Sequence, residues 1–294
     1  MDDYALPLAA ITFGAAIVNG ALGYGFSSIT VPLALLFLAN RVLNPALVLI
    51  EVVLNSWVLW VNRESLPAVW RRMLPIIIGL VPGVLLGTTL VSQINPAGLK
   101  LITYLTLLPL IFLQATGYRR PIKSEQAAGL VFGGGVGVLY SVTTISGPPL
   151  AVMLSNQGLT KRDFRAGLGL VRLAESSLTA VAYLYAGLHS EASLWLIPII
   201  LPSILIGVPI GARLIRRVQP DTFRRLCMSF DAWIVAFGLS RVLADMGIAP
   251  LPGAYLVMVP VGLLDSVLLY RFFSVPRPPG ADTIPPAAPP GGVP

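Results

Sequence analysis

The stretches GALGYGFSSITVPL (20–33) and GGGVGVLYSVTTISGPPL (133–150) decide the fold. Each lies inside a segment without a charged residue, 4–40 and 126–160. One straight helix of about 35 residues would measure about 52 Å, whereas the hydrocarbon core is about 30 Å thick. Two spans and a turn would need about 44 residues. Glycines and prolines in the middle therefore predict a broken helix or re-entrant hairpin in each segment, with irregular backbone that protein or a water-filled cavity must satisfy.

The composition indicates an integral membrane protein. Hydrophobic residues make up 55% of the 294 residues and charged residues 11%, against about 25% charged in a soluble domain. The 28 Gly and 26 Pro argue against a β-barrel and favour an all-α polytopic fold. The single Cys227 and single His189 exclude an internal disulfide, a thiolate metal site and a histidine cluster, so we expect no metal and no cofactor.

Uncharged or nearly uncharged segments define one transmembrane domain over 1–273. The segments run approximately over 5–39, 43–62, 73–92, 98–117, 126–157, 166–188, 193–212, 226–244 and 252–270. We predict about seven full spans plus two hairpins, with eight or nine simple transmembrane helices as the alternative. The tail 274–294 is rich in Pro, Gly and Ala, and we expect it to be disordered and cytoplasmic.

An internal repeat relates the two halves, about 5–117 and about 126–245, and leaves an extra C-terminal helix at about 252–273. The matches have similar spacings: Gly20, Pro32, Asn55, Gly83 and Gly87 fall opposite Gly137, Pro149, Glu175, Gly207 and Gly211. The alternative is chance matching of apolar sequence.

The distribution of Lys and Arg favours the hairpin interpretation. If both long segments return to the side they entered, sixteen of the 20 basic residues share one side and three the other. If each crosses once, the split is twelve to seven. Because cytoplasmic loops are enriched in Lys and Arg, we expect inverted repeats, an outside N-terminus and a cytoplasmic C-terminus in the plasma (inner) membrane. Because the basic residues lie in short loops between apolar segments, we expect them to orient the chain in the lipid bilayer and not to bind nucleic acid.

Small and hydroxylated residues gather at the two breaks. They are Gly25, Ser27, Ser28 and Thr30 in the first and Thr143, Thr144, Ser146 and Gly147 in the second. Half-helix N-termini present unpaired N–H groups and a partial positive charge, and hydroxyls add donors. We therefore predict a site for a small anion between the breaks, near the midplane. The alternative is that small residues simply permit close helix packing.

Ionisable residues inside the apolar segments are the remaining candidates. Arg172 is positioned to bind the anion, and Glu175 or Glu51, with Asn55 one turn from Glu51, to carry a coupling ion. The alternatives are a structural Arg172–Glu175 pair and a polar contact at Glu51. Asp231 and Asp265, also near segment interiors, rank lower because neither lies in the segments beside the two breaks. No nucleotide-binding, zinc-protease or nucleophile-elbow motif is present, which argues against an enzyme.

The two quoted stretches, with Arg165-Ala166 after the second, resemble the duplicated blocks of the sulfite exporter TauE/SafE family, also called the 4-toluene sulfonate uptake permease family. The resemblance covers roughly residues 5–270. The first half has Gly23-Tyr24-Gly25 where a Gly-Gly-Gly run is more usual. The resemblance implies a plasma-membrane permease for sulfite, sulfonates or similar anions, coupled to a gradient of H+ or Na+. An anion channel, a transporter of another small organic anion and an intramembrane enzyme are the alternatives.

Overall fold

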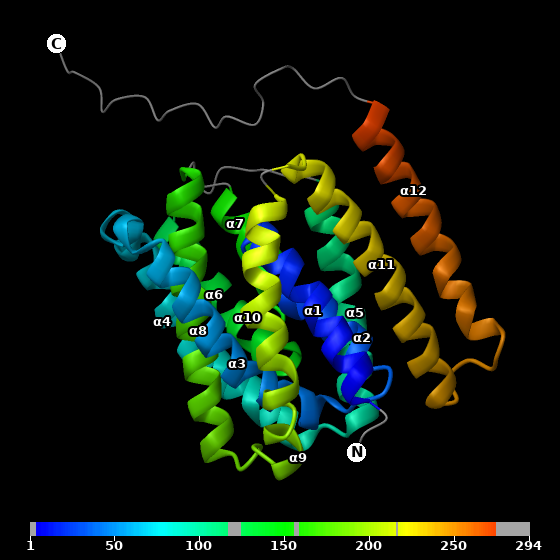
Figure 1. Ribbon diagram of the computed structural model, residues 1–294. Coiled ribbons are helices and arrows are strands. Elements are labelled where there is room, and N and C mark those ends of the chain that lie inside the picture. Colours follow the sequence, from blue (N-terminus) through cyan, green and yellow to red (C-terminus); the bar gives the residue numbers. More distant parts are fainter. Residues whose placement is uncertain (1–3, 117–124, 156–158, 216, 275–294) are drawn as a thin grey trace.

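The computed structural model describes residues 4–116, 125–155, 159–215 and 217–274. Within these ranges it contains helices and loops and no strands, which confirms the all-α prediction. In chain order the α-helices are α1 (Ala5–Leu22), α2 (Phe26–Ala34), α3 (Asn40–Val61), α4 (Leu66–Gln93), α5 (Pro96–Ala115), α6 (Glu125–Thr143), α7 (Gly147–Ser155), α8 (Lys161–Tyr185), α9 (Glu191–Leu194), α10 (Ile197–Leu214), α11 (Pro220–Asp245) and α12 (Met258–Ser274), with 3₁₀ turns η1 (Arg63–Ser65) and η2 (Gly253–Val257) (Figure 1). The proposed tail lies outside the described residues, apart from Ser274.

Seven described helical segments are long and apolar enough to cross a membrane. They include α1, which the sequence assigned to a hairpin. They leave out α8, which carries Arg172 and Glu175 as well as charged residues in its first turn. The described chain is therefore a multi-pass helical bundle, while the division into full spans and hairpins stays a prediction.

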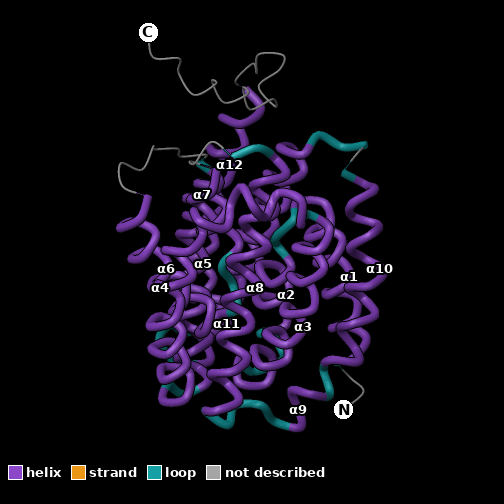
Figure 2. Tube along the Cα trace, turned by 90° about the vertical axis from the view of Figure 1, so that its left-hand side faces the viewer, coloured by secondary structure: helices purple, strands orange, loops and turns teal. Residues whose placement is uncertain are grey.

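The helices break inside both decisive stretches. Gly23 and Gly25, with φ of 84° and 104°, separate α1 from α2 in a left-handed conformation that glycine adopts without a steric cost. In the second break, between α6 and α7, Thr144 has a φ of 57°. Figure 2 shows loop segments inside the bundle as well as at its two ends.

Side chains from neighbouring helices satisfy backbone carbonyls at helix ends inside the bundle. At the C-terminal end of α2, Tyr104 donates to the Pro32 carbonyl at 2.8 Å, and Lys100 donates to the Leu35 carbonyl at 2.6 Å. At the second break, Asn44 donates to the Val142 carbonyl at 2.8 Å, and Tyr183 donates to the Ser141 carbonyl. Such pairing is what allows irregular backbone inside an apolar bundle.

Two pairs of helices run side by side in the same direction with backbones in close contact. Between α4 and α6, a Cβ on Gly83 would lie 2.2 Å from the Gly134 carbonyl oxygen. Between α1 and α10, a Cβ on Gly211 would lie 1.9 Å from the Ile17 carbonyl oxygen. Each pair joins one helix from each half of the chain, as small residues at helix contacts permit. The inverted orientation of the two halves stays a prediction.

One end of the molecule, here named the basic end, carries most described arginines. The start of α8 meets η1 there, because Arg162 and Glu64 approach to 3.9 Å. The end of α5, the start of α11 and the end of α12 line a common cavity at the same end. The basic end comprises Arg63, Arg71, Arg72, Arg162, Arg165, Arg213, Arg217, Arg224 and Arg271. The start of α1 and the helix α9 lie at the opposite end, which Figure 1 shows at the bottom.

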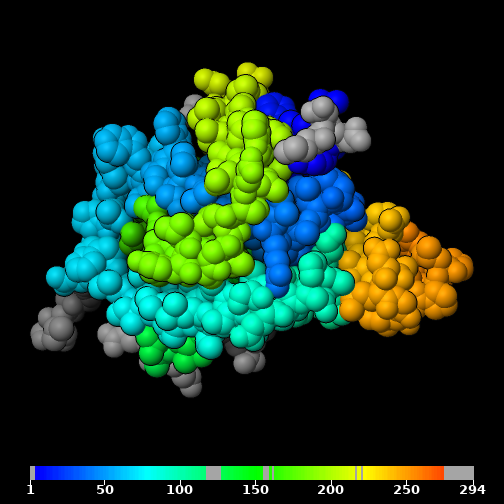
Figure 3. Space-filling view, turned by 90° about the horizontal axis from the view of Figure 1, so that it is seen from below, coloured from blue at the N-terminus to red at the C-terminus, as the bar shows by residue number. Residues whose placement is uncertain are grey.

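At the opposite end, Arg41 binds backbone carbonyls. Its guanidinium donates to the Ser92 and Ile94 carbonyls, both at 2.9 Å, and so satisfies backbone at the end of α4. Helix α12 lies at the edge of the bundle (Figure 1). Viewed from this opposite end, the orange connection between α11 and α12 lies at the periphery (Figure 3).

A buried ion pair of 2.8 Å between Arg225 of α11 and Asp265 of α12 holds the two helices together.

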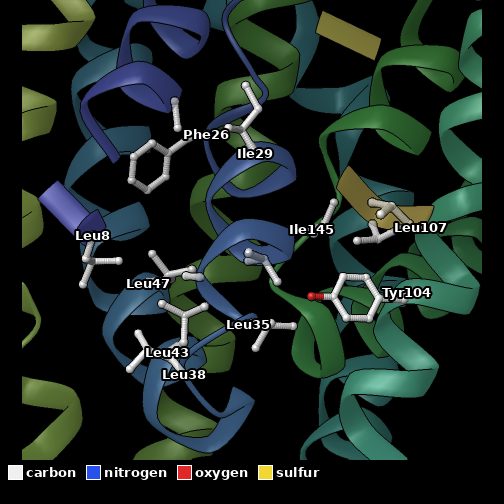
Figure 4. Close-up of a cluster of buried hydrophobic side chains, with 14 of the residues drawn as sticks. Leu8, Phe26, Ile29, Leu35, Leu38, Leu43, Leu47, Tyr104, Leu107 and Ile145 are labelled. Carbon is white, nitrogen blue, oxygen red and sulfur yellow. The ribbon is translucent and has the colours of Figure 1, made fainter. Parts of the chain in front are cut away.

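The largest apolar cluster lies around the first break. Figure 4 shows Phe26 and Ile29 of α2, Leu43 and Leu47 of α3 and Ile145 of the second break among its members. This cluster packs α2 against α3 and so holds the polar side chains of the two helices in position.

Candidate functional site

A buried ion pair joins the two halves of the chain. Glu51, in the middle of α3, and Arg172, in the middle of α8, lie 2.9 Å apart between Oε1 and Nη2. Their side chains are 0% and 3% exposed. The sequence alternative paired Arg172 with Glu175, but the closer partner is Glu51 from the other half.

Glu51 is held by three donors. Its Oε1 accepts from the Ser27 hydroxyl and from Arg172, and its Oε2 accepts from the Tyr140 hydroxyl at 2.7 Å. Both oxygens of Glu51 therefore accept hydrogen bonds. Hydrogen bonds to an ionised acceptor are shorter and stronger than neutral ones.

Glu175 has a different environment. Its Oε1 accepts from the Ser146 hydroxyl and lies 4.0 Å from Arg172 Nε. Its Oε2 is buried and has no hydrogen-bond partner among the residues that the structure describes. A buried carboxylate with one free oxygen is a suitable place for a proton, because the protonated form avoids the cost of a second buried negative charge.

The two halves use serines in the same way. Ser27, at the start of α2, donates to a carboxylate on α3, the long helix that follows it in the chain. Ser146, just before α7, donates to a carboxylate on α8, the long helix that follows it. Each break is thus hydrogen-bonded to a buried carboxylate.

The predicted site residues divide into separate groups. Ser27, Ser146, Glu51, Arg172 and Glu175 come together in the ion-pair network. Asn55 is buried one turn from Glu51, and within the described part of the chain its Nδ2 has no partner. No contact that the structure gives ties Asn55 to this network.

Three predicted hydroxyls face the local backbone or have no partner. Thr143 donates to the Leu139 carbonyl at 2.7 Å, and Thr144 donates to the Thr143 carbonyl at 2.7 Å. Thr30 is fully buried, and no described residue forms a hydrogen bond with its hydroxyl. The first two hydroxyls must exchange these bonds before they can bind an anion.

Gly25, Ser28 and Gly147 lie where the two breaks meet. A Cβ on Gly147 would come within 3.3 Å of the Tyr24 Cβ. Gly25 and Ser28 line a cavity of about 20 Å³ together with Pro148 from the second break. Among the described residues, no side-chain cap is present at the start of α2, where Gly25 is the N-cap, and the first N–H groups of a helix have no partner within the helix itself.

The structure adds Tyr140, Tyr24 and Gln114 to the predicted residues. Tyr140 binds Glu51, and Gln114 donates to the Tyr24 hydroxyl at 2.9 Å. Tyr140 stands inside the quoted stretch 133–150, where its hydroxyl was an available signal. Gln114 lies near the end of an apolar helix, and only the packing of α5 against the first break reveals its role. Among the described residues, no group of His, Cys, Asp and Glu side chains could hold a metal ion.

Comparison with known proteins bears on the function of this arrangement. The model of the family described as "Sulfite exporter TauE/SafE" matches residues 8–238. The match includes both breaks, Glu51, Arg172 and Glu175. No solved structure matches the chain.

Two curated proteins are similar to the chain. "Probable inner membrane transporter protein TsaS" of Comamonas testosteroni is 26% identical over 181 residues, covering 58% of this chain and 71% of that protein. "Probable sulfite/organosulfonate exporter TauE" of Cupriavidus necator is 24% identical over 178 residues, covering 59% of this chain and 68% of that protein.

Proposed function

The chain belongs to the sulfite exporter TauE/SafE family and is a membrane transporter rather than an enzyme, and from this premise we propose that it moves small sulfur-containing anions by secondary-active transport. Sulfite and organosulfonates are the proposed substrates, which the printed name of the Cupriavidus necator relative supports. The coupling ion is a proton.

The observation that carries the proposal is the position of Arg172 between two buried carboxylates. Glu51 lies 2.9 Å away and Glu175 4.0 Å away, and each carboxylate also accepts from a serine at a helix break. Buried ionisable residues in membrane proteins are costly and mark ion and substrate pathways. Arg172 thus links the two breaks through charge.

Charge balance explains the coupling. With both carboxylates ionised, Glu51, Arg172 and Glu175 carry one net negative charge. A proton on Glu175 makes the three side chains neutral, and a bound sulfonate restores one negative charge. The buried net charge is then the same in the empty, deprotonated state and in the loaded, protonated state, so proton and anion move together. The direction of net transport follows from the two gradients.

The proposed substrate site lies where the breaks meet. An anion that leaves water must replace its hydration with fixed donors. The start of α2 supplies backbone N–H groups, Ser28 supplies a hydroxyl, and Arg172 supplies the balancing charge. Protonation of Glu175 also releases the Ser146 hydroxyl from a carboxylate, so that it can donate to the anion. The proposed site is completed by the remaining predicted residues of the two breaks, which are Gly25, Ser27, Thr30, Thr143, Thr144 and Gly147. Glu51 and Asn55 are proposed to lie next to the site rather than to bind the anion.

We place the basic end in the cytoplasm, because cytoplasmic loops are enriched in Lys and Arg. The N-terminus is then outside and the C-terminal tail inside. Residues 1–273 form one transporter domain, with inverted repeats at about 5–117 and about 126–245 and an extra C-terminal helix at about 252–273.

Purified protein in liposomes tests this function. We would measure uptake of labelled sulfite, sulfate and methanesulfonate under an imposed pH gradient, an imposed sodium gradient or neither. We expect saturable uptake of sulfite or methanesulfonate that the pH gradient accelerates and that the other sulfur anions inhibit.

The same measurement separates the alternatives. Flux that rises linearly with concentration and ignores both gradients would indicate a channel. Acceleration by sodium alone would keep secondary transport but replace the proposed coupling ion.

A further inference from the structure

A cavity of about 330 Å³ opens at the basic end, on the side of the molecule where α5, α11 and α12 meet. Its volume is at the lower limit for small-molecule sites. Arg224, Arg225 and Arg271 line it, with Asp221 as the acidic member of the lining and Gln114 as a neutral polar member. Positive charge therefore exceeds negative charge around this cavity.

The three arginines are held differently. Arg225 is buried and bound to Asp265 at 2.8 Å, so it shapes the wall. Arg224 lies 3.3 Å from Asp221, which is one turn earlier on α11. Arg271 reaches the cavity from the last turn of α12. Guanidinium groups suit oxyanions because they offer several donors in one plane. Arg224 and Arg271 thus provide two such groups from different helices.

This cavity adjoins the proposed substrate site. The small cavity that contains Gly25 and Ser28 shares Gln114, Arg224 and Met228 with the larger one. Its volume of about 20 Å³ has room for about one water molecule. The hydrogen bond from Gln114 to the Tyr24 hydroxyl lies at this narrow point. The large cavity is therefore separated from the breaks by side chains that belong to both cavities.

We propose that the cavity at the basic end is an entry vestibule that binds the oxyanion between Arg224 and Arg271 before it passes Tyr24 and Gln114 to reach the breaks. The inference rests on the proposed function for the identity of the anion. Two physical claims do not depend on that function: the cavity selects anions, and it adjoins the small cavity that Ser28 lines. The phosphate of an anionic lipid has the same chemistry and is the other possible occupant.

Thiol labelling tests the vestibule without relying on transport. Ala115 lines the cavity, and the single Cys227 can be replaced by Ser. We would label an Ala115→Cys/Cys227→Ser protein with an anionic methanethiosulfonate (sulfonatoethyl) and a cationic one (trimethylammonioethyl), each rate being divided by its rate with a free thiol. We expect at least about a tenfold preference for the anionic reagent, because charged clefts raise the local concentration of counter-ions by such factors. Methanesulfonate should slow the anionic labelling.

Variants assign the preference to the two arginines. Arg224→Gln/Arg271→Gln should remove the preference and the protection. Arg213→Gln/Arg217→Gln removes the same two charges at the basic end from positions outside the cavity lining, and it should preserve both the preference and the protection. In liposomes that transport sulfite, the double variant should raise the KM for flux from the basic end about tenfold and leave the maximal rate unchanged.

Each contrary outcome has its own meaning. Equal normalised rates for the two reagents, or no labelling by either, would overturn the vestibule. Protection that appears only in vesicles with phosphatidylglycerol and not with phosphatidylcholine would assign the cavity to a lipid headgroup. Labelling as expected in a protein that does not transport sulfite or methanesulfonate would contradict the proposed function but not the anion-selective cavity.

Discussion

Glu51 and Glu175 look equivalent as residues in apolar helices, yet the structure gives them different environments. Glu51 accepts from Ser27, Tyr140 and Arg172, whereas Glu175 accepts from Ser146 and keeps one oxygen without a partner in the part of the chain that the structure describes. The sequence singles out both carboxylates as ion carriers. It cannot rank them, because the ranking depends on donors from three other helical segments. In our account Glu51 is the fixed anion and Glu175 the carrier.

The first prediction concerns Glu51. Glu51→Gln should lower the free energy of unfolding by about 3–5 kcal/mol, because it breaks a buried ion pair and turns an amide NH2 toward groups that all donate. The measurement is the unfolding midpoint in detergent.

Glu64→Gln is the matched control. Glu64 makes an exposed ion pair with Arg162 at 3.9 Å, and its loss should cost no more than about 1 kcal/mol. Equal effects of the two variants would show that the Glu51 network does not stabilise the fold.

The second prediction concerns the hydroxyls at the breaks. Ser28→Ala/Thr144→Ala should weaken substrate binding at least about tenfold, since each charge-assisted hydrogen bond contributes roughly 1.5–3 kcal/mol. Thr89→Ala/Ser92→Ala removes two exposed hydroxyls that bind their own helix and should leave affinity unchanged. Unaltered affinity in the first variant would make these residues packing elements and move the site elsewhere.

At the scale of elements, the contacts of α4 with α6 and of α1 with α10 hold the broken helices in place. The sequence matches Gly83 and Gly87 with Gly207 and Gly211. It does not show that glycines of one half face helices of the other. That arrangement depends on the three-dimensional path of the chain, whereas the positions of the breaks follow from local glycines and prolines.

The third prediction compares two glycines on one helix. A Cβ on Gly133 would lie 2.1 Å from the Ile76 carbonyl oxygen, whereas a Cβ on Gly135 would meet nothing within 4 Å. Gly133→Ala should therefore destabilise the protein by about 1–3 kcal/mol. Gly135→Ala should be neutral or stabilise α6 by up to about 1 kcal/mol. Thermal unfolding of both variants in detergent is the test, and equal midpoints would contradict the close α4–α6 contact.

At the scale of the molecule, the sequence predicted a strong separation of charge, and the structure gathers most described arginines at the basic end. Hydropathy and the charge of the loops are sufficient to predict this separation, because both are properties of whole segments of the sequence. They do not reveal the cavity at the basic end, since Gln114, Arg224 and Arg271 come from three helices that only tertiary packing brings together.

The fourth prediction concerns topology. In a Cys227→Ser background, Arg162→Cys and a cysteine replacing Arg120, between α5 and α6, should react with an impermeant reagent from the same side of the membrane. Glu191→Cys, at the start of α9, should react from the other side. Labelling of the Arg120 and Arg162 positions from opposite sides would mean that the segment 126–160 crosses once.

The central claim is that Glu175 couples a proton to the movement of the anion, and simultaneous recording of both fluxes in liposomes tests it most directly. With sulfite or methanesulfonate, the wild-type protein should take up protons together with anion, and a pH gradient should drive accumulation above the external concentration. Glu175→Gln should still exchange anion across the membrane at equal pH, but without proton uptake and without accumulation. Proton-driven accumulation that persists in Glu175→Gln would contradict the account.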